Sequence, residues 1–406
     1  MYLSHLSLEN FRNYARLELD LPPGTVVLLG RNAQGKTNLL EAIYYLATSK
    51  SFRATNDREI VNWLALEEDQ AVARLVGRCQ REKGPVEVEI AVRAARTDNG
   101  ADDLPTVNAK RIRVNKTARR AIDLIGQVNV VMFTPQDIEL VSGAPLLRRR
   151  YIDVTISQVD PQYCRTLAHF NRVVGQRNHL LRRIRDRHAR NDQIQFWDEE
   201  LVKAGTTITV QRRQALEELS ELAEVYHRQL TGTGERLRIV YRPSIDLDRY
   251  LGNAVDLMAD PSAAVSRGFQ EQLRRLQARE IAMGMSLLGP HRDDLQFLID
   301  QVNVNSYGSR GQQRTVSLSL KLAESSFLNH HTGEKPILLL DDILSELDEP
   351  RRRFVVETIK NGQQVLVTGT DLHAFPRSFL EQVALLAVEN GAVSDLVLSG
   401  DEAVPR

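Results

Sequence analysis

The chain has 406 residues, enough for two or more domains with a large buried core. Its 42% hydrophobic and 26% charged residues are typical of soluble globular proteins, and no stretch is apolar for long enough to span a bilayer. The 53 basic and 53 acidic residues cancel, which excludes a uniformly basic protein but allows local basic surfaces. Two widely separated cysteines and the lack of a visible secretory signal predict a cytoplasmic protein without disulfides.

The first predicted elements are strands. Leucines alternate with polar residues near residues 6–8 and at 17–21, and residues 10–14 between them are predicted to turn. A short apolar run at residues 25–30 follows a Pro-Pro-Gly turn and predicts a third strand. Leu39, Leu40, Ile43 and Leu46 recur at helical spacing, so residues 36–47 are predicted to form a helix.

The loop between this strand and this helix matches the phosphate-loop pattern G-x-x-x-x-G-K-[ST]. Glycines let the loop turn its N–H groups toward a phosphate, and the helix N-terminus adds partial positive charge. Lys36 can reach the β- and γ-phosphates, and the Thr37 hydroxyl can bind Mg²⁺. A chance glycine turn is the alternative, and the flanking strand and helix argue against it. The expected nucleotide-binding residues are Gly30, Arg31, Asn32, Ala33, Gln34, Gly35, Lys36 and Thr37.

Further along, strands give way to helices. Alternation at residues 86–90 and 111–114, with a turn at Asn115 and Lys116, predicts a β-rich region over 70–133 with a polar loop at 96–105. Residues 156–230 and 260–285 are predicted to form long amphipathic helices, interrupted by a short strand-like piece near 238–245. The α/β character returns after Gly289. We therefore expect an α/β unit interrupted by a helical insertion, with domains at 1–150, 151–285 and 286–406.

A second phosphate-site element is predicted at residues 337–342, where four apolar residues precede Asp341 and Asp342. A buried parallel strand that ends in aspartate at a ligand crevice is typical of nucleotide hydrolases. Asp341 is expected to hold Mg²⁺ together with Thr37, and Asp342 to polarise the attacking water as a catalytic residue.

Residues 309–313 (Ser-Arg-Gly-Gln-Gln) precede the helix that leads into this strand. A serine N-cap and a glycine at a helix start can bind an anion, although an ordinary capped helix is the better explanation of this segment by itself. Its position matches the S-x-G-Q signature that ATPases of the ABC class carry one helix before the aspartate strand. The signature residues would then be Ser309, Arg310, Gly311 and Gln312.

Taken together, these motifs resemble the RecF family of bacterial recombination mediators, which is related to the structural-maintenance-of-chromosomes ATPases. The resemblance rests on residues 10–14, 30–37, 50–53, 133–137, 142–145, 148–150, 289–294, 309–314 and 341–348. It implies an ABC-type P-loop ATPase head split by a short coiled-coil-like helical arm. It also implies a homodimer that sandwiches ATP and Mg²⁺, with the signature segment acting in trans, and slow, DNA-stimulated hydrolysis that serves as a switch.

The resemblance further implies a cytoplasmic protein of DNA repair, replication-gap processing and the SOS response that helps to load RecA with RecR and RecO. It assigns Gln136 as a second catalytic residue, with Asp137 as an alternative. Residues 365–368 are predicted to form another strand, and the switch position after it stays open between Thr370 and His373. Arg53 is either a solvated surface residue or a contact to the γ-phosphate or DNA.

Basic residues gather in a predicted hairpin and at the junction between the head and the arm, and both sets are candidates for contacts to DNA phosphates. Sparse aromatic residues predict recognition of the backbone of a duplex or a duplex–single-strand junction. Other hypotheses are the ATP-binding subunit of a transporter, a small-molecule kinase and a chromosome-structure protein. The helical insertion and the basic sets count against the first, and the signature segment and the arm have no purpose in the second. The short arm counts against the third. The candidates for DNA contacts are Lys110, Arg111, Arg113, Lys116, Arg148, Arg149 and Arg150.

Overall fold

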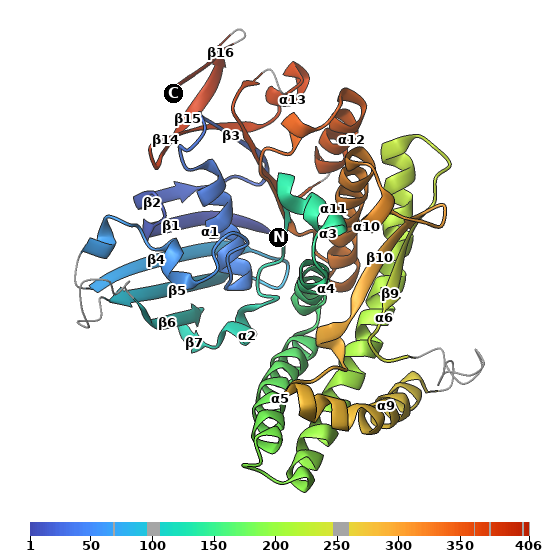
Figure 1. The fold of residues 1–406 in the computed structure, drawn as a ribbon. Coiled ribbons are helices and arrows are strands. Elements are labelled where there is room, and N and C mark those ends of the chain that lie inside the picture. Colours follow the sequence, from blue (N-terminus) through green and yellow to red (C-terminus); the bar gives the residue numbers. More distant parts are fainter. Residues whose placement is uncertain are drawn as a thin grey trace. The chain divides into compact units, whose positions relative to one another are not determined.

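The computed structural model describes residues 1–67, 70–95, 106–246, 260–360, 362–372, 375–399 and 402–405 (Figure 1). The chain forms two compact units. The first unit comprises Met1–Asp137, Gln229–Thr231 and Glu324–Arg406, and the second unit comprises Ile138–Arg228 and Gly232–Ala323.

These units divide the chain at other places than the expected domains 1–150, 151–285 and 286–406. The structure groups residues 286–323 with the helical insertion, because strand β10 (Asp294–Ile299) pairs with β9 (Leu237–Arg242). The expected return of α/β character after Gly289 is therefore a separate small sheet, and the first unit resumes only at Glu324.

The first unit contains a seven-stranded sheet in the order β16-β15-β14-β3-β13-β12-β8. Its five strands from β14 to β8 run parallel, and β15 and β16 continue it in antiparallel fashion. The predicted strands at 25–30, 337–340 and 365–368 are confirmed as its centre. The strand bounds are β3 Gly24–Leu29, β8 Val130–Phe133, β12 Ile337–Leu340, β13 Gln364–Gly369, β14 Ala384–Glu389, β15 Ala392–Ser399 and β16 Glu402–Pro405.

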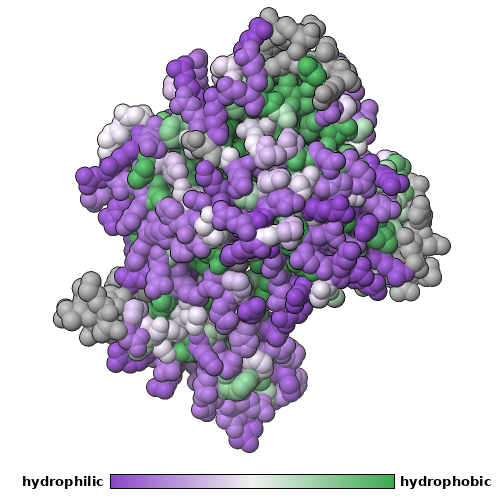
Figure 2. Space-filling model, turned by 180° about the vertical axis from the view of Figure 1, so that it is seen from behind, coloured by the Kyte–Doolittle hydropathy of each residue, from purple (hydrophilic) through white to green (hydrophobic). Residues whose placement is uncertain are grey.

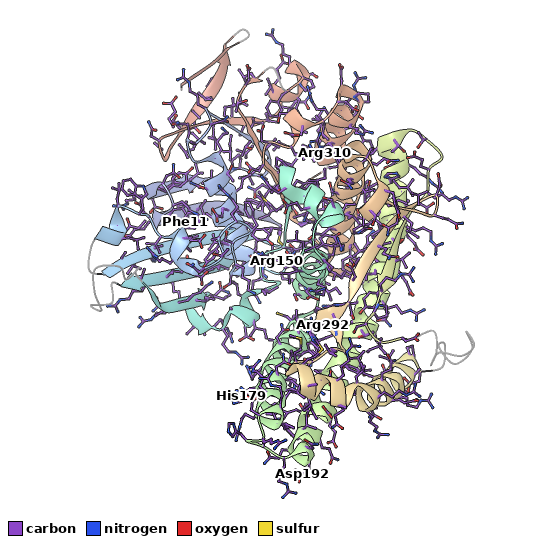
Figure 3. All side chains as sticks on the ribbon, viewed as in Figure 1. Phe11, Arg150, His179, Asp192, Arg292 and Arg310 are labelled. Carbon is purple, nitrogen blue, oxygen red and sulfur yellow. The ribbon has the colours of Figure 1, made fainter. Side chains whose placement is uncertain are left out.

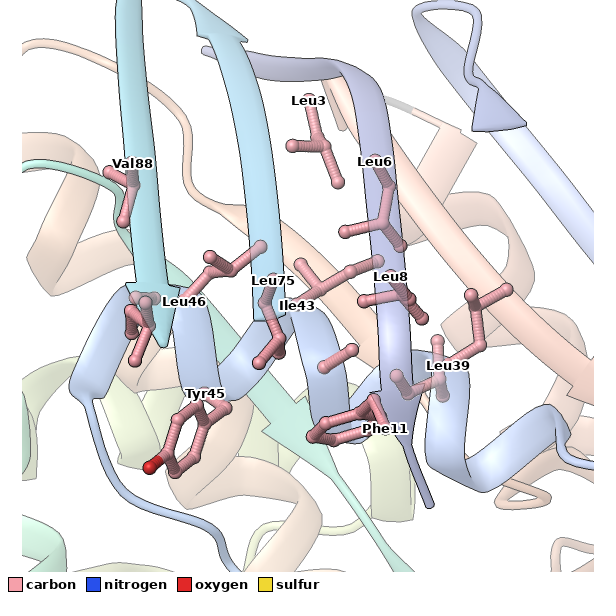
Figure 4. Packing of buried hydrophobic residues seen from close by; sticks show 14 of the residues in the cluster. Leu3, Leu6, Leu8, Phe11, Leu39, Ile43, Tyr45, Leu46, Leu75 and Val88 are labelled. Atoms are coloured by element: carbon pink, nitrogen blue, oxygen red, sulfur yellow. The ribbon is translucent and has the colours of Figure 1, made fainter. Parts of the chain in front are cut away.

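A second, antiparallel sheet of the first unit has the order β2-β1-β4-β5-β6-β7. Apolar side chains on one face of its strands pack on helix α1 (Lys36–Thr48), as Figure 4 shows for Leu6, Leu8, Leu75 and Ile43. The predicted N-terminal strands and the turn at Asn115 and Lys116 are confirmed. The bounds are β1 Tyr2–Phe11, β2 Tyr14–Asp20, β4 Gln70–Gln80, β5 Val86–Ala95, β6 Thr106–Val114 and β7 Thr117–Arg119.

Short helices and one longer helix complete the described part of the first unit. The predicted polar loop at 96–105 lies outside the described residues. The helices are η1 Asp57–Ile60, η2 Ala65–Glu67, α2 Ala121–Leu124, η3 Pro135–Asp137, η6 Leu344–Glu346, α12 Glu349–Lys360 and α13 Arg377–Leu380.

The second unit is mostly helical, as the amphipathic pattern predicts, and contains the small sheet β11-β10-β9. Helices α6 and α11 each continue beyond it into residues of the first unit. The bounds are α3 Ile138–Ser142, α4 Pro145–Val159, α5 Pro161–Arg185, η4 Asn191–Ile194, α6 Gln195–Thr231, α9 Pro261–Met283, η5 Pro290–Arg292, β11 Val302–Asn303, α10 Val304–Tyr307 and α11 Arg310–Thr332.

Two buried arginines cross-link the helices of the second unit. Arg177 of α5 is fully buried and donates to Asp198 at 2.7 Å and to the equally buried Glu280 at 2.6 Å. Arg212 of α6 donates to Asp153 at 2.9 Å and to Asp293 at 3.1 Å. Buried guanidinium groups need such partners because an unpaired buried charge is very costly.

Within the described ranges, no helix is long and apolar enough to cross a membrane. Hydrophilic residues cover most of the face in Figure 2, which agrees with a 26% share of charged residues.

Candidate nucleotide-binding site

The phosphate-loop residues lie at the carboxyl end of β3 and lead into α1, as the sequence predicts. Helix α1 starts without a side-chain cap and without an acidic residue in its first turn, so its N-terminus is open to an anion. The Lys36 ammonium lies across the loop and donates to the carbonyl oxygens of Gly30 at 2.5 Å and Arg31 at 2.9 Å. In this arrangement the lysine is held inside the loop that it is expected to serve.

Both glycines of the motif are required by the local geometry. Gly35 has φ 119°, and a Cβ there would lie 2.7 Å from the Asn13 amide nitrogen. At Gly30 a Cβ would lie 2.3 Å from the carbonyl oxygen of Val388. Ala33 also adopts a left-handed conformation, with φ 65°, at a position where an L-residue is strained.

Asp341 lies where β12 ends, beside the start of α1. Its Oδ1 accepts hydrogen bonds from the Thr37 hydroxyl at 2.9 Å and from the Thr368 hydroxyl of β13 at 3.0 Å. The parallel pairing of β12 with β13 places these two strand ends together. The structure thus brings the two expected Mg²⁺ ligands, Thr37 and Asp341, into direct contact.

Burial shapes the charges at this site. Desolvation raises the pKa of Asp341 above its ordinary value, while the hydroxyls of Thr37 and Thr368 and the charge of Arg53 oppose the rise. Desolvation lowers the pKa of Lys36, and the negative charges of Asp342 and Asp341 oppose that shift. The site thus combines a buried ammonium, which could contact a phosphate, with two carboxylates, which could bind a divalent cation.

Asp342 follows directly and adopts a left-handed backbone conformation with φ 50°. Its N–H donates to the Thr368 hydroxyl at 2.8 Å, and its carbonyl accepts from the Ser345 hydroxyl at 2.8 Å. The side chain is only partly buried. Asp342 is therefore held by its backbone, and its carboxylate is left at the edge of the site near Lys36.

Arg53 is exposed and donates to the Asn38 side chain at 3.3 Å. Its loop is held from beneath by Ser51, whose hydroxyl accepts from the N–H of Arg53 at 2.8 Å and donates to the buried Glu41 of α1 at 2.5 Å. Glu41 also receives a two-pronged contact from Arg12 at 2.7 and 2.9 Å. The guanidinium of Arg53 is therefore anchored next to the first turn of α1 and close enough to influence Asp341.

Other expected site residues are less well defined. Gln136 is exposed in η3, just after β8, and neighbouring Asp137 accepts from the N–H of Thr134 at 2.7 Å. Because β8 and β12 are parallel neighbours, the ends of both strands, and with them Gln136 and Asp341, lie at the same edge of the sheet. Of the two switch candidates, Thr370 is exposed after β13, and His373 lies outside the described residues.

The signature segment belongs to the second unit. Ser309, Arg310, Gly311 and Gln312 are all exposed at the start of α11, where Figure 3 labels Arg310. The Ser309 hydroxyl accepts from the N–H of Gln312 at 3.2 Å, and the Gln312 side chain accepts from the N–H of Ser309 at 3.0 Å. This reciprocal cap matches the expected serine N-cap and leaves the segment accessible.

The basic set of the predicted hairpin is only partly exposed. Lys110 lies on the core face of β6 and donates to the Ser49 carbonyl at 2.5 Å and to Asp57 at 3.0 Å, above the Tyr45 ring. Lys110 therefore does not belong to an exposed basic surface, since residues at even numbers of this strand face inward. Arg111, Arg113 and Lys116 are exposed, and Arg113 pairs with Glu89 at 3.4 Å.

The second basic set also divides. Arg148 is 5% exposed and contacts both carboxylate oxygens of Asp294, at 2.7 and 3.1 Å. Arg148 therefore forms an internal ion pair of the second unit and does not belong to an exposed basic surface. Arg149 donates to the Asp293 carbonyl at 2.7 Å, and only Arg150, labelled in Figure 3, is exposed.

Sequence reasoning missed three residues that hold the site together: Thr368, Asn13 and Tyr14. The hydroxyl of Tyr14 donates to the Gly35 carbonyl at 3.0 Å, and the Asn13 side chain donates to the Gln34 carbonyl at 2.9 Å. Thr368 could have been suspected from its place at the end of an apolar strand. Nothing local to residues 13 and 14 indicates the loop they contact.

Comparison with known proteins agrees with this geometry. A family model described as the RecF/RecN/SMC N-terminal domain matches residues 2–393. The DNA replication and repair protein RecF of Roseiflexus castenholzii is 45% identical over 96% of this chain and 99% of its own length. RecF of Bacillus mycoides is 37% identical over 97% and 98%.

Solved structures give the same result. The recombination mediator protein RecF with ATP, from the RecFOR pathway, superposes with a TM-score of 0.81 at 29% identity and covers 98% of both chains. An Smc head domain from Pyrococcus yayanosii shares the fold, with a TM-score of 0.52 at 12% identity, over 98% of this chain and 97% of that one. The fold is that of an ABC-type ATPase head, and the chain belongs to the RecF family.

Proposed function

We propose that this protein is an ATP-gated DNA-binding protein of recombinational repair and replication-gap processing. The observation that carries the proposal is the 2.9 Å hydrogen bond from Thr37 to Asp341 at the sheet edge, next to Lys36, whose ammonium lies across the phosphate loop 2.5 Å from the Gly30 carbonyl oxygen. Relatives named DNA replication and repair protein RecF cover nearly the whole chain, and a similar structure is described with ATP. Both support the proposal.

The residues present suit ATP and Mg²⁺. An uncapped helix N-terminus and the Lys36 ammonium would hold the β- and γ-phosphates, and Lys36 would exchange two loop carbonyls for phosphate oxygens. A hydroxyl and a carboxylate oxygen are ligands that Mg²⁺ prefers, and Thr37 and Asp341 supply them. When bound, Mg²⁺ would neutralise phosphate charge. Arg53, anchored beside Asn38, would add positive charge near the γ-phosphate.

Two copies of the chain would close over two nucleotides. The exposed, reciprocally capped segment from Ser309 to Gln312 offers a hydroxyl, N–H groups and a side-chain amide to a phosphate of the partner subunit. ATP would favour the closed dimer because it contacts both chains there and only one chain in the open form. Asp342, and with it Gln136, would orient the attacking water, so that slow hydrolysis reopens the dimer.

DNA would be bound through its backbone by exposed basic side chains. Arg111 and Lys116 are exposed on the β6–β7 hairpin, and no carboxylate of the described residues pairs with them. Arg113 and Arg150 are further candidates, while Lys110 and Arg148 are held inside. Placement of RecA at gaps with the help of RecR and RecO, in the cytoplasm, completes the proposed role.

Light scattering with and without ATP tests the proposal most directly. The wild-type protein is expected to dimerise with ATP, and a short duplex is expected to strengthen the effect. Lys36→Ala removes the phosphate-binding ammonium and is expected to abolish ATP-dependent dimerisation. Lys335→Ala, which removes an ammonium far from the motif in sequence, serves as a control. A normal ATP-induced dimer in Lys36→Ala would refute the assignment.

Two further variants separate the steps. Ser309→Arg is expected to leave ATP binding intact and to block closure, because the bulky cation fills the segment offered to the partner's nucleotide. Asp342→Asn is expected to bind ATP and dimerise but to hydrolyse slowly, which lengthens the life of the dimer. Hydrolysis at the wild-type rate in Asp342→Asn would contradict its role.

For DNA, the joint variant Arg111→Ala/Lys116→Ala is expected to bind duplex more weakly and with a shallower dependence on salt, because two phosphate contacts are lost. Arg120→Ala is the matched control, since Arg120 is paired with Asp123 at 3.0 Å. Equal salt slopes for the joint variant and the wild type would remove this surface from the proposal.

A further inference from the structure

The turn between β14 and β15 lies against the phosphate loop, although Asn390 of the turn and Gln34 of the loop are 356 positions apart in the sequence. Asn390 has φ 49° and Gly391 has φ 78°, and Glu389 pairs with Ala392, so the two residues form a tight type I′ turn. The two turn residues lie beyond the last paired residues of the hairpin. Their N–H groups are therefore available to another segment.

Gln34 of the phosphate loop accepts both of these N–H groups. Its side-chain oxygen accepts from Asn390 at 2.8 Å, and its main-chain carbonyl accepts from Gly391 at 3.1 Å. The same carbonyl accepts from the Asn13 side chain at 2.9 Å. One loop residue is thus held by donors from two segments that are distant from it in sequence.

The hairpin and the loop are also packed closely. A Cβ at Gly391 would lie 2.4 Å from the main-chain oxygen of Asn13, and a Cβ at Gly30 would lie 2.3 Å from the main-chain oxygen of Val388. Real Cβ atoms do not approach backbone atoms so closely, so only glycine fits at these two positions. The turn therefore packs directly against the phosphate loop.

These contacts have a consequence for the direction of the loop's peptide groups. In a trans peptide the C=O and the following N–H point in opposite directions, and the described chain has no cis peptide. Asn13 and Gly391 hold the Gln34 carbonyl, and Tyr14 holds the Gly35 carbonyl. Donors that hold both carbonyls outward leave the N–H groups of Gly35 and Lys36 directed to the other side.

The phenol of Tyr14 is protonated at physiological pH and can donate, and burial raises its pKa further above the ordinary value. Asn13 is fixed in turn, since its side-chain oxygen accepts from Asn38 of α1 at 2.8 Å. Residues 13 and 14 and the hairpin turn therefore hold the loop together, through the carbonyl groups of Gln34 and Gly35.

We propose that Gln34 is a positioning residue that couples the phosphate loop to the β14–β15 turn, so that this turn orients the loop for a nucleotide diphosphate group and responds when that group binds. This rests on the proposed function, because it requires a nucleotide at the loop. The contacts involve the peptides that would face the α- and β-phosphates, so ATP and ADP are affected alike.

The test combines nucleotide affinity with hydrogen exchange of the full chain. Gly391→Ala forces the turn away from Asn13 and is expected to weaken ADP and ATP binding by about tenfold, the loss of one to two hydrogen bonds. Gln34→Met keeps the length of the side chain without its acceptor and is expected to weaken both by roughly threefold to tenfold. In the wild type, ADP is expected to slow exchange of the amides at 386–393, and this protection is lost in Gln34→Met.

Gly84→Ala is the matched control. Gly84 has φ 102°, so alanine there is strained as at Gly391, but a Cβ would meet nothing within 4 Å and the phosphate loop is not involved. It is expected to change ADP affinity by less than about twofold. Equal effects of the two glycine variants, or a wild-type hairpin whose exchange is insensitive to ADP, would overturn the coupling. A wild-type chain that binds no nucleotide would instead refute the proposed function itself.

Discussion

Replacing Thr368 by valine tests whether one buried hydroxyl holds the aspartate strand end. Thr368 is 2% exposed, donates to Asp341 at 3.0 Å and accepts from the N–H of Asp342 at 2.8 Å. Valine has the same shape and lacks both contacts. A hydrogen bond to a carboxylate contributes about 1.5 to 3 kcal/mol, and a buried N–H without a partner costs about 1 to 3 kcal/mol. Since that N–H is only partly buried, we expect the free energy of unfolding to fall by roughly 2 to 4 kcal/mol.

Thr209→Val is the matched control. Thr209 is 1% exposed, and its hydroxyl has no hydrogen-bond partner among the described residues. The same change of hydroxyl to methyl therefore removes no contact, and we expect the free energy of unfolding to stay constant or to rise by up to about 1 kcal/mol.

The two tryptophans allow each unit to be followed separately, because Trp63 lies in the first unit and Trp197 in the second. Thr368→Val is measured by urea unfolding in a Trp197→Phe background and Thr209→Val in a Trp63→Phe background. A lower midpoint at unchanged slope shows a loss of stability. If Thr368→Val destabilises its unit no more than Thr209→Val does, the hydroxyl does not hold Asp341 and Asp342 in place.

Three further outcomes follow from the structure. Burial lowers the pKa of His291 to about 4, below its ordinary 6.5, so stability that is present above pH 6.5 is lost as the pH falls toward 4. The loss is roughly 3 kcal/mol, at about 1.4 kcal/mol per pKa unit. Urea unfolding of His291→Gln between pH 7 and 4 should show a free energy of unfolding that depends less on pH, and an equally steep dependence would contradict the lowered pKa of His291. Arg177→Met leaves Glu280 buried without its partner and should lower the free energy of unfolding by about 3 to 5 kcal/mol. The joint change with Glu280→Leu should recover part of this loss, as measured by calorimetry, and no recovery would argue against a stabilising ion pair. Ala33→Gly relieves a left-handed alanine and should raise stability by about 0.5 to 1 kcal/mol by chemical unfolding, and a loss would show that Ala33 is not strained.

The sequence was sufficient to predict the local elements of the site. The strand, loop and helix around Lys36 and the aspartate strand at 337–340 are confirmed, because each depends on short-range spacing that a sheet with helices reproduces. Their meeting followed from one rule, that parallel strands carry their ligands at the same edge. The structure places Thr37 and Asp341 2.9 Å apart.

Other contacts depend on which strands become neighbours, and spacing does not contain that information. Thr368 reaches Asp341 only because β13 lies between β12 and β3, and Gln34 meets Gly391 only because β14 is the next strand beyond β3. The division into units was also not predictable, since β10 pairs with a strand that precedes it by more than 50 residues.

Two of the basic residues could have been judged better from the sequence. Lys110, Ile112 and Val114 are spaced two residues apart, so strand periodicity places all three on the same face, which is the core face. Arg148 stands three, four and seven residues before Tyr151, Ile152 and Thr155, which form the buried face of α4. Counting positive charges along the chain ignored the direction in which each side chain points.

The order of strands in the seven-stranded sheet has a consequence for how the chain is made. The strand that bears the phosphate loop lies between β13 and β14, so this strand does not have both of its neighbours until residue 389 has left the ribosome. The second unit, by contrast, is almost continuous from 138 to 323 and can fold during synthesis. The contacts that close the first unit are of very long range in sequence, and such contacts form slowly. A nascent chain therefore carries its phosphate-loop sequence for most of its synthesis without a site that can hold a nucleotide.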